Sequence, residues 1–168
     1  MPDNLVTDRL TLIPLAADAA RLITEDRAAA AAVLGIEIPE AWPYSDLLDF
    51  LPIYAKMVQD DPTELGWGIW VMAYRGLLVG DIGFHGRPDA AGRVEIGYSV
   101  QFDYRGRGFA PEAALALIEW ASAHPDVSRI IARCYPDNAS SIRVLQKIGM
   151  QPIGGPDDEG LLVWASFA

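Results

Sequence analysis

The spacing of hydrophobic positions predicts a largely helical first third of the chain. Residues 9–15 (RLTLIPL) alternate between polar and apolar side chains and predict a first strand. Two helices are expected next, over residues 16–35 and 45–61, because both segments have helical composition with a glycine or serine at a boundary. Pro52 lies inside the second segment and is expected to interrupt or kink that helix.

From Trp67 onward the hydrophobic period changes to two, which is typical of strands. Three strands are expected in succession, over residues 67–75, 77–86 and 93–102. Residues 93–102 (RVEIGYSVQF) show the alternation throughout their length. A meander of three strands therefore follows the helical region.

The remainder of the chain alternates helices with strands. The expected elements are a helix from about Pro111, a strand over SRIIARCYP, a helix over NASSIRVLQKIG, and two closing strands over MQPIG and GLLVWASF. The complete pattern predicts an α+β fold with a mixed, mostly antiparallel central sheet of about seven strands flanked by four helices.

Length and composition favour one cytoplasmic domain over residues 1–168. The chain is 51% hydrophobic, which is normal for a soluble fold, and its apolar runs are far shorter than the roughly 18 to 20 residues of a membrane span. The first ten residues contain acidic side chains and no apolar stretch of the kind found in secretion signals. The single cysteine, Cys134, excludes an intrachain disulfide and is interpreted as a buried thiol.

The charge balance makes some partners improbable. Thirteen lysines and arginines stand against 23 aspartates and glutamates, for a formal net charge of −10. Nucleic acid is disfavoured, because binding to its phosphate backbone needs clustered cations. A basic substrate fits better, although a negative surface also simply keeps a protein in solution. No metal site is expected, because two distant histidines without a cysteine cluster lack ligand spacing.

A basic, glycine-rich loop precedes the apolar helix in YRGRGFAPEAALALIEWASA (104–123). Gly106 and Gly108 let the backbone approach a phosphate at the helix start, and Arg105 and Arg107 add positive charge. The segment lacks the Gly-Lys-Ser/Thr ending of a nucleotide P-loop and the third glycine of a dinucleotide fingerprint. An ordinary tight connection between a strand and a helix is the alternative interpretation.

Two sequence blocks carry a resemblance to a known family. RGRGFA has the form R-x-x-G-x-A, with Arg105, Gly108 and Ala110 at the defining positions, and resembles the acetyl-CoA pyrophosphate loop of the GNAT superfamily of N-acetyltransferases. NASSIRVLQKIGM (138–150) matches a second GNAT pattern. VEIGYSV and TDRLTLIPL resemble the branch that contains the ribosomal-protein N-terminal alanine and serine acetyltransferases.

The resemblance implies that acetyl-CoA is the cosubstrate. It places backbone contacts to the pantetheine arm on the strand before the loop, phosphate contacts on the loop, and further contacts at the start of the following helix. The implied residues are Tyr98, Ser99, Val100, Arg105, Gly106, Arg107, Gly108, Phe109, Ala110, Asn138 and Ser141. The structural alternatives are a core strand for GYSV and an N-cap for Asn138.

Glu95 is the candidate general base. By alternation it shares a strand face with Gly97 and Ser99, whose small side chains leave room for a substrate, and a cleft is expected to raise its pKa. Several members of the family carry a catalytic glutamate at this strand position. The alternatives are a glutamate on a solvated face, one paired with Arg93, or base catalysis through an ordered water.

Ser141 is the candidate group for the departing thiolate. Many GNAT enzymes place a tyrosine seven residues after the motif asparagine, but this sequence has Leu145 there. Helical spacing puts Ser141 on the same stripe, one turn nearer the helix start. The alternative is a serine that bonds its own backbone.

The first third of the chain is a candidate source for the wall of an acceptor pocket. His85 shares a strand face with Asp81, although a single histidine near a turn is more often only exposed. Five aromatic residues are candidates for the pocket wall or for the core: Trp42, Tyr44, Tyr54, Trp67 and Trp70.

The resulting hypothesis is an N-acetyltransferase in which an amine attacks acetyl-CoA directly, without a covalent enzyme intermediate. The acceptor is a protein N-terminal amine, as the resembling branch suggests, or a small amine such as a polyamine, an amino acid or an aminoglycoside. A CoA-binding module without catalytic activity is the alternative from a different class. A monomer and a homodimer are both compatible with the sequence.

Overall fold

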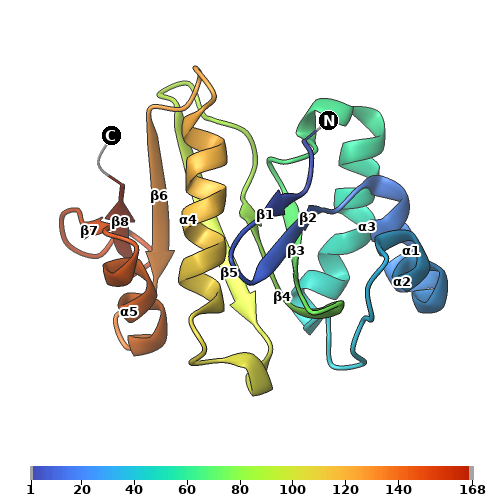
Figure 1. Ribbon diagram of the computed structural model, residues 1–168. Coiled ribbons are helices and arrows are strands. Elements are labelled where there is room, and N and C mark those ends of the chain that lie inside the picture. The colour runs from blue at the N-terminus through green and yellow to red at the C-terminus, as the bar shows by residue number, and fades with distance from the viewer. Residues whose placement is uncertain (1, 167–168) are drawn as a thin grey trace.

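The computed structural model describes residues 2–166 as one twisted sheet with helices on both faces (Figure 1). The strands are β1 (Leu5–Val6), β2 (Leu10–Pro14), β3 (Ile69–Tyr74), β4 (Leu77–Phe84), β5 (Arg93–Val100), β6 (Arg129–Cys134), β7 (Gln151–Pro152) and β8 (Leu162–Ala165). The α-helices are α1 (Ala17–Glu25), α2 (Arg27–Leu34), α3 (Ser45–Asp60), α4 (Phe109–Ser122) and α5 (Ala139–Lys147). Short 3-10 turns, η1 (Pro62–Glu64) and η2 (Phe102–Tyr104), follow α3 and β5.

The strand order is β1-β2-β3-β4-β5-β6-β8-β7. All neighbouring strands are antiparallel except β5 and β6, which are parallel. The chain reaches β6 from β5 through α4, which is the crossover that a parallel pair requires. The sheet is therefore mixed, with one parallel junction near its middle.

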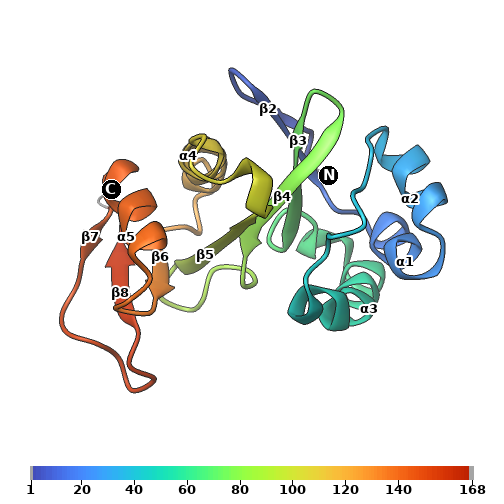
Figure 2. The ribbon, with the colours of Figure 1, turned by 90° about the horizontal axis from the view of Figure 1, so that it is seen from below.

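Two hydrophobic cores lie on opposite faces of the sheet. One joins α4 and α5 to the sheet and contains Leu117 and Leu145, which are 0% and 1% exposed. The other joins α1, α2 and α3 to the sheet and contains Leu51, which is fully buried. Figure 2 shows α4 on one side of β4 and β5 and α3 on the other. The strands between them thus have buried side chains on both faces, as the long apolar runs of β3 and β4 require.

The parallel pairing of β5 with β6 is short. It covers only Arg93, Val94 and Glu95, which pair with Arg129, Ile130 and Ile131. Beyond Glu95, β5 stays with β4 as far as Val100, and β6 stays with β8 as far as Cys134. The sheet consequently opens into a V between β5 and β6.

A β-bulge interrupts the pairing of β3 with β4. Met72 pairs with Gly80 but Ala73 pairs with Leu78, so Val79 has no partner on β3. Leu78 packs into the core beneath α1 to α3, and Val79 packs into the core beneath α4. Since a bulge adds one residue to the alternation, Asp81 faces the same side of the sheet as Leu78, three positions away.

The expected α+β fold with a mixed, mostly antiparallel sheet is confirmed, with small differences in the elements. Residues 16–35 form two helices, because Asp26 breaks the first and its side chain accepts a hydrogen bond from Ala29 N at the start of α2. Pro52 lies inside α3, which runs unbroken past it. The strand β1 was not expected, and the predicted last strand extended to Phe167, outside the described residues.

No helix of residues 2–166 is long and apolar enough to cross a membrane.

Leu117→Ala is expected to lower the free energy of unfolding by about 3 kcal/mol, because it leaves a cavity in the core beneath α4. Leu115→Ala on the same helix is the matched control, since Leu115 is 51% exposed and its truncation should change the free energy by less than about 0.5 kcal/mol. Urea unfolding of both variants checks this difference. Equal losses would contradict the packing of α4.

Candidate active site

Two cavities meet at the point where β5 leaves β6. The first, of about 600 Å³, lies between α3 and the strands β4 and β5. The second, of about 620 Å³, lies between β5, the start of α4 and α5. Tyr98 and Ser99 line both cavities. A reaction between two ligands, one in each cavity, would therefore take place across this part of β5.

The free edge of β5 faces the second cavity. His85 N donates to Glu95 O and Gln101 N donates to Val79 O, each at 2.9 Å, so the odd-numbered residues of β5 direct their backbone groups to β4. By alternation, Tyr98 and Val100 direct theirs into the V. This edge offers the amide groups with which an extended ligand can pair.

The loop before α4 and the first turn of the helix form a cradle of backbone NH groups beside that edge. Gly106 and Gly108 have φ angles of 73° and 81°, in the left-handed region that favours glycine, and Gly108 is the N-cap of α4. Arg105 Nε donates to Val100 O at 2.9 Å, which joins the loop to the end of β5. The backbone NH groups of the first helical turn are left available for an anion.

Arg9 on the β1–β2 connection supports this loop from outside. Its guanidinium donates to Arg107 O at 2.8 Å and to the Glu112 carboxylate at 2.6 Å. Burial alone would raise the pKa of Glu112, but hydrogen bonds from Thr7 and Arg9 and the charge of Arg9 hold it below its usual value. These contacts hold the β1–β2 connection against the start of α4, although the two segments are about 100 residues apart in sequence.

Ten of the eleven residues expected to contact the cofactor line the second cavity. They are Tyr98, Ser99, Val100, Arg105, Gly106, Gly108, Phe109, Ala110, Asn138 and Ser141. Arg107 is not among the residues that line it, and its guanidinium lies 4.9 Å from the centre of the Tyr104 ring. The structure adds two cations of α5, Arg143 and Lys147. Their spacing of four residues on one helix face was a usable signal in the sequence.

The start of α5 presents Ser141 to the V. Asn138 Oδ1 accepts hydrogen bonds from Ser141 N at 3.1 Å and from the Ser140 hydroxyl at 2.9 Å, so Asn138 is an N-cap. The Tyr98 hydroxyl donates to Ser141 O at 3.3 Å, and burial raises the pKa of Tyr98 to about 12. A hydrogen bond with the Ser141 side chain partly opposes this rise, so the hydroxyls of Ser141 and Tyr98 lie together beside the second cavity.

Glu95 is held by two partners at the base of the V. Its carboxylate accepts from Arg133 Nε at 3.1 Å on both oxygens and lies 3.3 Å from His85 Nδ1. Burial acts to raise the pKa of Glu95, but these hydrogen bonds and charges outweigh it and leave the pKa lowered. The prediction of a raised pKa for Glu95 was wrong, because the ion pair of Glu95 with Arg133 of β6 is not visible in the sequence. The ion pair is with Arg133, whereas Arg93 pairs with Asp89.

Arg133 ties the base of the V to the β7–β8 connection. Its Nη1 lies 2.9 Å from the Glu159 carboxylate and 3.4 Å from that of Asp157. Asp157 Oδ1 also accepts from the backbone NH groups of Glu159 and Leu161, which shapes the loop. One guanidinium therefore links β5, β6 and this loop.

His85 projects over β5 into the first cavity. It lines that cavity, and a Cβ added to Gly97 would lie 2.9 Å from His85 Nε2. A side chain at position 97 would thus displace the imidazole, so glycine is required for this approach. Although its side chain is 61% exposed, His85 is also held by Glu95 through Nδ1.

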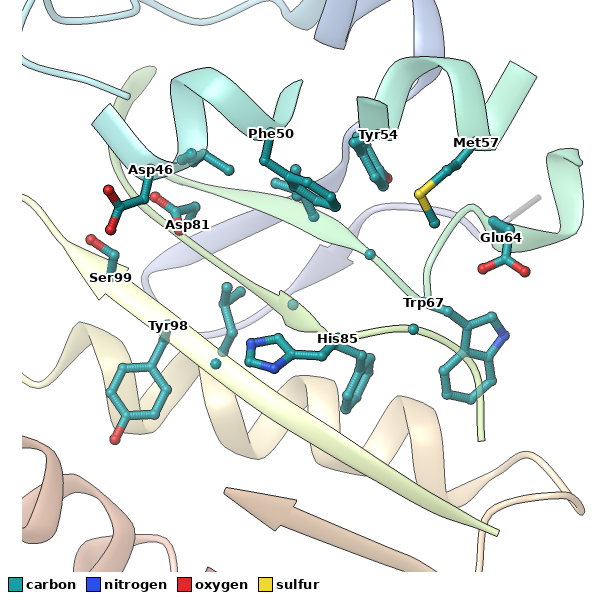
Figure 3. Close-up of a pocket in the computed structure, with 18 residues that line it drawn as sticks. Asp46, Phe50, Tyr54, Met57, Glu64, Trp67, Asp81, His85, Tyr98 and Ser99 are labelled. Atoms are coloured by element: carbon teal, nitrogen blue, oxygen red, sulfur yellow. The ribbon is translucent and has the colours of Figure 1, made fainter. Parts of the chain in front are cut away.

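The wall of the first cavity comes from α3 and the residues around it (Figure 3). Tyr54 and Trp67 line it as expected, joined by Phe50 and Met57. The remaining predicted aromatic residues divide between core and surface: Trp42 and Trp70 are fully buried and Tyr44 is 39% exposed.

Asp81 is the carboxylate of β4 that faces this cavity. Its Oδ2 accepts a hydrogen bond from Trp42 Nε1 at 2.7 Å. Burial raises the pKa of Asp81 to about 6, and the hydrogen bond from Trp42 only partly opposes this rise. In Figure 3 Asp81 and Asp46 lie at the end of the cavity beside Ser99, and Glu64 lies at the opposite end near Trp67.

A family model described as "Acetyltransferase (GNAT) domain" matches residues 9–151 of the chain. The chain belongs to the GNAT acetyltransferase family. The matched range contains β2 to β6, α1 to α5 and every residue that lines the two cavities. The described cavities are therefore those of an acetyltransferase domain.

Individual relatives agree with this membership. The uncharacterised N-acetyltransferase YjdG of Bacillus subtilis (strain 168) is 36% identical over 118 residues, which are 69% of this chain and 70% of that protein. Among solved structures, the ribosomal L7/L12 alpha-N-protein acetyltransferase RimL shares the fold with a TM-score of 0.70 at 14% identity, covering 100% of this chain and 96% of RimL. The microcin C7 self-immunity acetyltransferase MccE, solved with acetyl-CoA and AMP, has a TM-score of 0.67 at 19% identity, covering 96% and 93%.

Within the described part of this acetyltransferase, no group of three or more histidine, cysteine, aspartate or glutamate residues has the arrangement of a metal site.

The stability of the wild-type protein is expected to fall as pH rises from about 4 to about 6, and Asp81→Asn is expected to abolish this fall. The folded chain keeps the Asp81 proton up to about pH 6, whereas the unfolded chain releases it near pH 3.8, so stability falls as pH rises through this window. Urea unfolding of both proteins at pH 4 and pH 7 measures the effect. The advantage of the variant should grow from the lower to the higher pH, and a constant difference would contradict the raised pKa.

Proposed function

We propose that this GNAT protein transfers an acetyl group from acetyl-CoA to a primary amine, with acetyl-CoA in the second cavity and the amine in the first. The observation that carries the proposal is that Tyr98 and Ser99 line both cavities where β5 leaves β6. A thioester lying along the free edge of β5 is then open to attack from the other face of the strand.

The second cavity fits the parts of acetyl-CoA. The backbone groups of Tyr98 and the NH of Val100, which have no partner strand, suit the amides of the pantetheine arm. The start of α4 suits the pyrophosphate. Arg105, Arg143 and Lys147 place three cations around the same cavity, which suits a ligand with several phosphates. The fold neighbour MccE was solved with acetyl-CoA.

Acetyl-CoA supplies an activated acetyl thioester, and the protein must stabilise the sulfur as it leaves. The Ser141 hydroxyl is the proposed donor to that sulfur, since Ser141 lines the second cavity at the start of α5. The Tyr98 hydroxyl, bound to Ser141 O, instead holds α5 against β5. Ser141 is thus proposed to act on the reacting atoms and Tyr98 to position it.

Direct transfer without an acetylated enzyme is the proposed route. Cys134 is 6% exposed, and burial raises the pKa of its thiol, so the thiolate that a covalent step needs is disfavoured. Glu95, the candidate base, is engaged by Arg133 and absent from the residues that line the first cavity. Its contact with His85 supports a positioning role, in which Glu95 holds the imidazole over Gly97.

The first cavity limits the size of the acceptor. At about 600 Å³ it has room for a small amine or for the first residues of a peptide. A protein N-terminal amine and a small molecule such as a polyamine, an amino acid or an aminoglycoside remain the two acceptor classes. Thiol release from acetyl-CoA, measured with a panel of both, tests the proposal. CoA binding without thiol release for any amine would favour a binding module instead.

Ser141→Ala is expected to lower kcat by roughly ten- to a thousandfold while the Kd for acetyl-CoA changes little, because the hydroxyl acts on the leaving sulfur. Ser128→Ala is the control, since the Ser128 hydroxyl donates to Ala91 O and Ser128 lines neither cavity. Steady-state thiol release and calorimetric CoA binding measure the two quantities. An unchanged kcat in Ser141→Ala would remove Ser141 from the mechanism.

Gly108→Val is expected to weaken CoA binding by roughly tenfold or more, which is about 1.4 kcal/mol. Valine is strained at a φ of 81°, and its side chain would stand at the α4 cradle with Arg9 3.3 Å from the new Cβ. Gly76→Val is the control for strain alone, because Gly76 has a φ of 79° in the β3–β4 turn with open space around it. Full CoA affinity in a folded Gly108→Val protein would refute the loop assignment.

A further inference from the structure

We propose that Asp81 is the general base that removes a proton from the acceptor ammonium. This inference rests on the proposed acetyl transfer and names a residue of the first cavity that sequence reasoning did not assign. It depends on where the β-bulge of β4 directs Asp81, on what holds its carboxylate, and on what the neighbouring carboxylates are engaged in.

The backbone brings Asp81 to the reacting end of the cavity. The bulge at Val79 turns Asp81 away from the α4 core, and the register pairs Asp81 directly with Ser99 on β5. Ser99 is one of the two residues shared by both cavities. The side chains of directly paired antiparallel residues lie about 5 Å apart at Cβ, so Asp81 stands beside the place where thioester and amine meet.

The carboxylate is held by one oxygen only. The indole of Trp42, itself fully buried, donates to Oδ2 and fixes the plane of the group. Within the described chain, no donor to Oδ1 is present. A carboxylate that lines a cavity, with one oxygen anchored and no donor on the other, is suited to accept a proton from a bound ligand.

The other acidic side chains around the first cavity either accept hydrogen bonds from other residues or lie away from Ser99. Glu95 is bound by Arg133 and His85 and does not line the cavity. Glu64 lies at the far end, beside Trp67 rather than Ser99 (Figure 3). Asp46 lies near Asp81 but belongs to the exposed first turn of α3, where it accepts from the Ser45 hydroxyl at 3.3 Å.

The electrostatic surroundings agree with this geometry. The titratable groups that share the cavity with Asp81 are Asp46 from α3, His85 directly after β4, Tyr98 from β5, and Glu64 and Tyr54 farther along the cavity. No lysine or arginine is among the described residues that line it. Burial raises the pKa of Asp81 to about 6, so at neutral pH the carboxylate is ionised yet more basic than an ordinary aspartate.

In the proposed step, the ammonium nitrogen gives one proton to Asp81 Oδ1. The neutral nitrogen then forms a bond to the thioester carbon. The carbon–sulfur bond breaks, the sulfur takes the electron pair, and the second amine proton ends on that sulfur with Ser141 as hydrogen-bond donor. Asp81 then releases its proton to solvent, which leaves an acetamide, a thiol and one free proton.

The test is the pH dependence of kcat for an amine that the wild-type protein acetylates, at saturating acetyl-CoA. Wild-type kcat should fall below an apparent pKa near 6, because protonated Asp81 cannot accept a proton. Asp81→Asn should lower kcat by roughly a hundred- to ten-thousandfold and abolish that fall. Its affinity for CoA should be unchanged, since Asp81 is outside the second cavity.

Two further variants separate a lost base from a damaged fold. Asp60→Asn, an exposed carboxylate at the end of α3 paired with Lys56, should keep the wild-type profile. Asp81→Ala should regain part of its kcat when formate is added, because the small carboxylate can replace the missing one. Asparagine keeps an oxygen for Trp42, so the fold of Asp81→Asn can be verified by unfolding before the kinetics.

The outcomes are distinct. An active wild type with Asp81→Asn within about threefold of its kcat overturns the role of Asp81 and leaves the acetyl transfer standing. The same conclusion follows if the acidic fall persists in Asp81→Asn but disappears in His85→Gln or Glu95→Gln. A wild type that binds CoA and acetylates no amine overturns the proposed function itself, and the role of Asp81 with it.

Discussion

The early separation of β5 from β6 is the constraint on which the rest of this acetyltransferase depends. Only three residue pairs join the two strands before they diverge, while each strand remains fully paired on its other side. The backbone groups of Tyr98 and Val100 are therefore left without a partner strand. Because unpaired backbone groups are costly to bury, this edge is a site that a peptide-like ligand arm can complete.

The charges at the base of the V explain how such an opening is kept in place. Arg133 binds Glu95 across the junction and also binds Asp157 and Glu159 of the β7–β8 connection. A single guanidinium with several planar donors suits this task better than an ammonium would. Arg9 and Glu112 fix the loop at the start of α4. Ion pairs between segments far apart in the chain thus hold both the base of the V and this loop.

The carboxyl groups of Glu95 on β5 and Asp81 on β4 have their pKa values shifted in opposite directions, because their surroundings differ. Glu95 has a cation and a histidine beside it, and its pKa is lowered. Asp81 has one indole NH and an apolar environment, and its pKa is raised to about 6. Groups whose environments push their pKa values apart take different parts in acid–base chemistry. The contacts of Glu95 fit positioning, whereas those of Asp81 fit proton transfer.

The sequence by itself determined the fold class and the order of most elements, because these depend on local periodicity. Through its resemblance to the GNAT family it also pointed to ten of the residues that line the second cavity. It did not determine which charges meet. Arg133 lies 38 residues from Glu95, and Trp42 lies 39 residues from Asp81, so both pairs exist only through the sheet register and the packing of α3.

The tertiary structure also decided which face of the sheet carries the Asp81 side chain. If side chains alternated strictly along β4 after Leu78, Asp81 would face the core beneath α4. The bulge at the unpaired Val79 places Asp81 on the opposite face of the sheet. A bulge is a property of two strands in register, not of one segment. Local patterns and the family resemblance therefore pointed to the loop before α4 and to the free edge of β5, while the long-range register decided which carboxylate faces the first cavity.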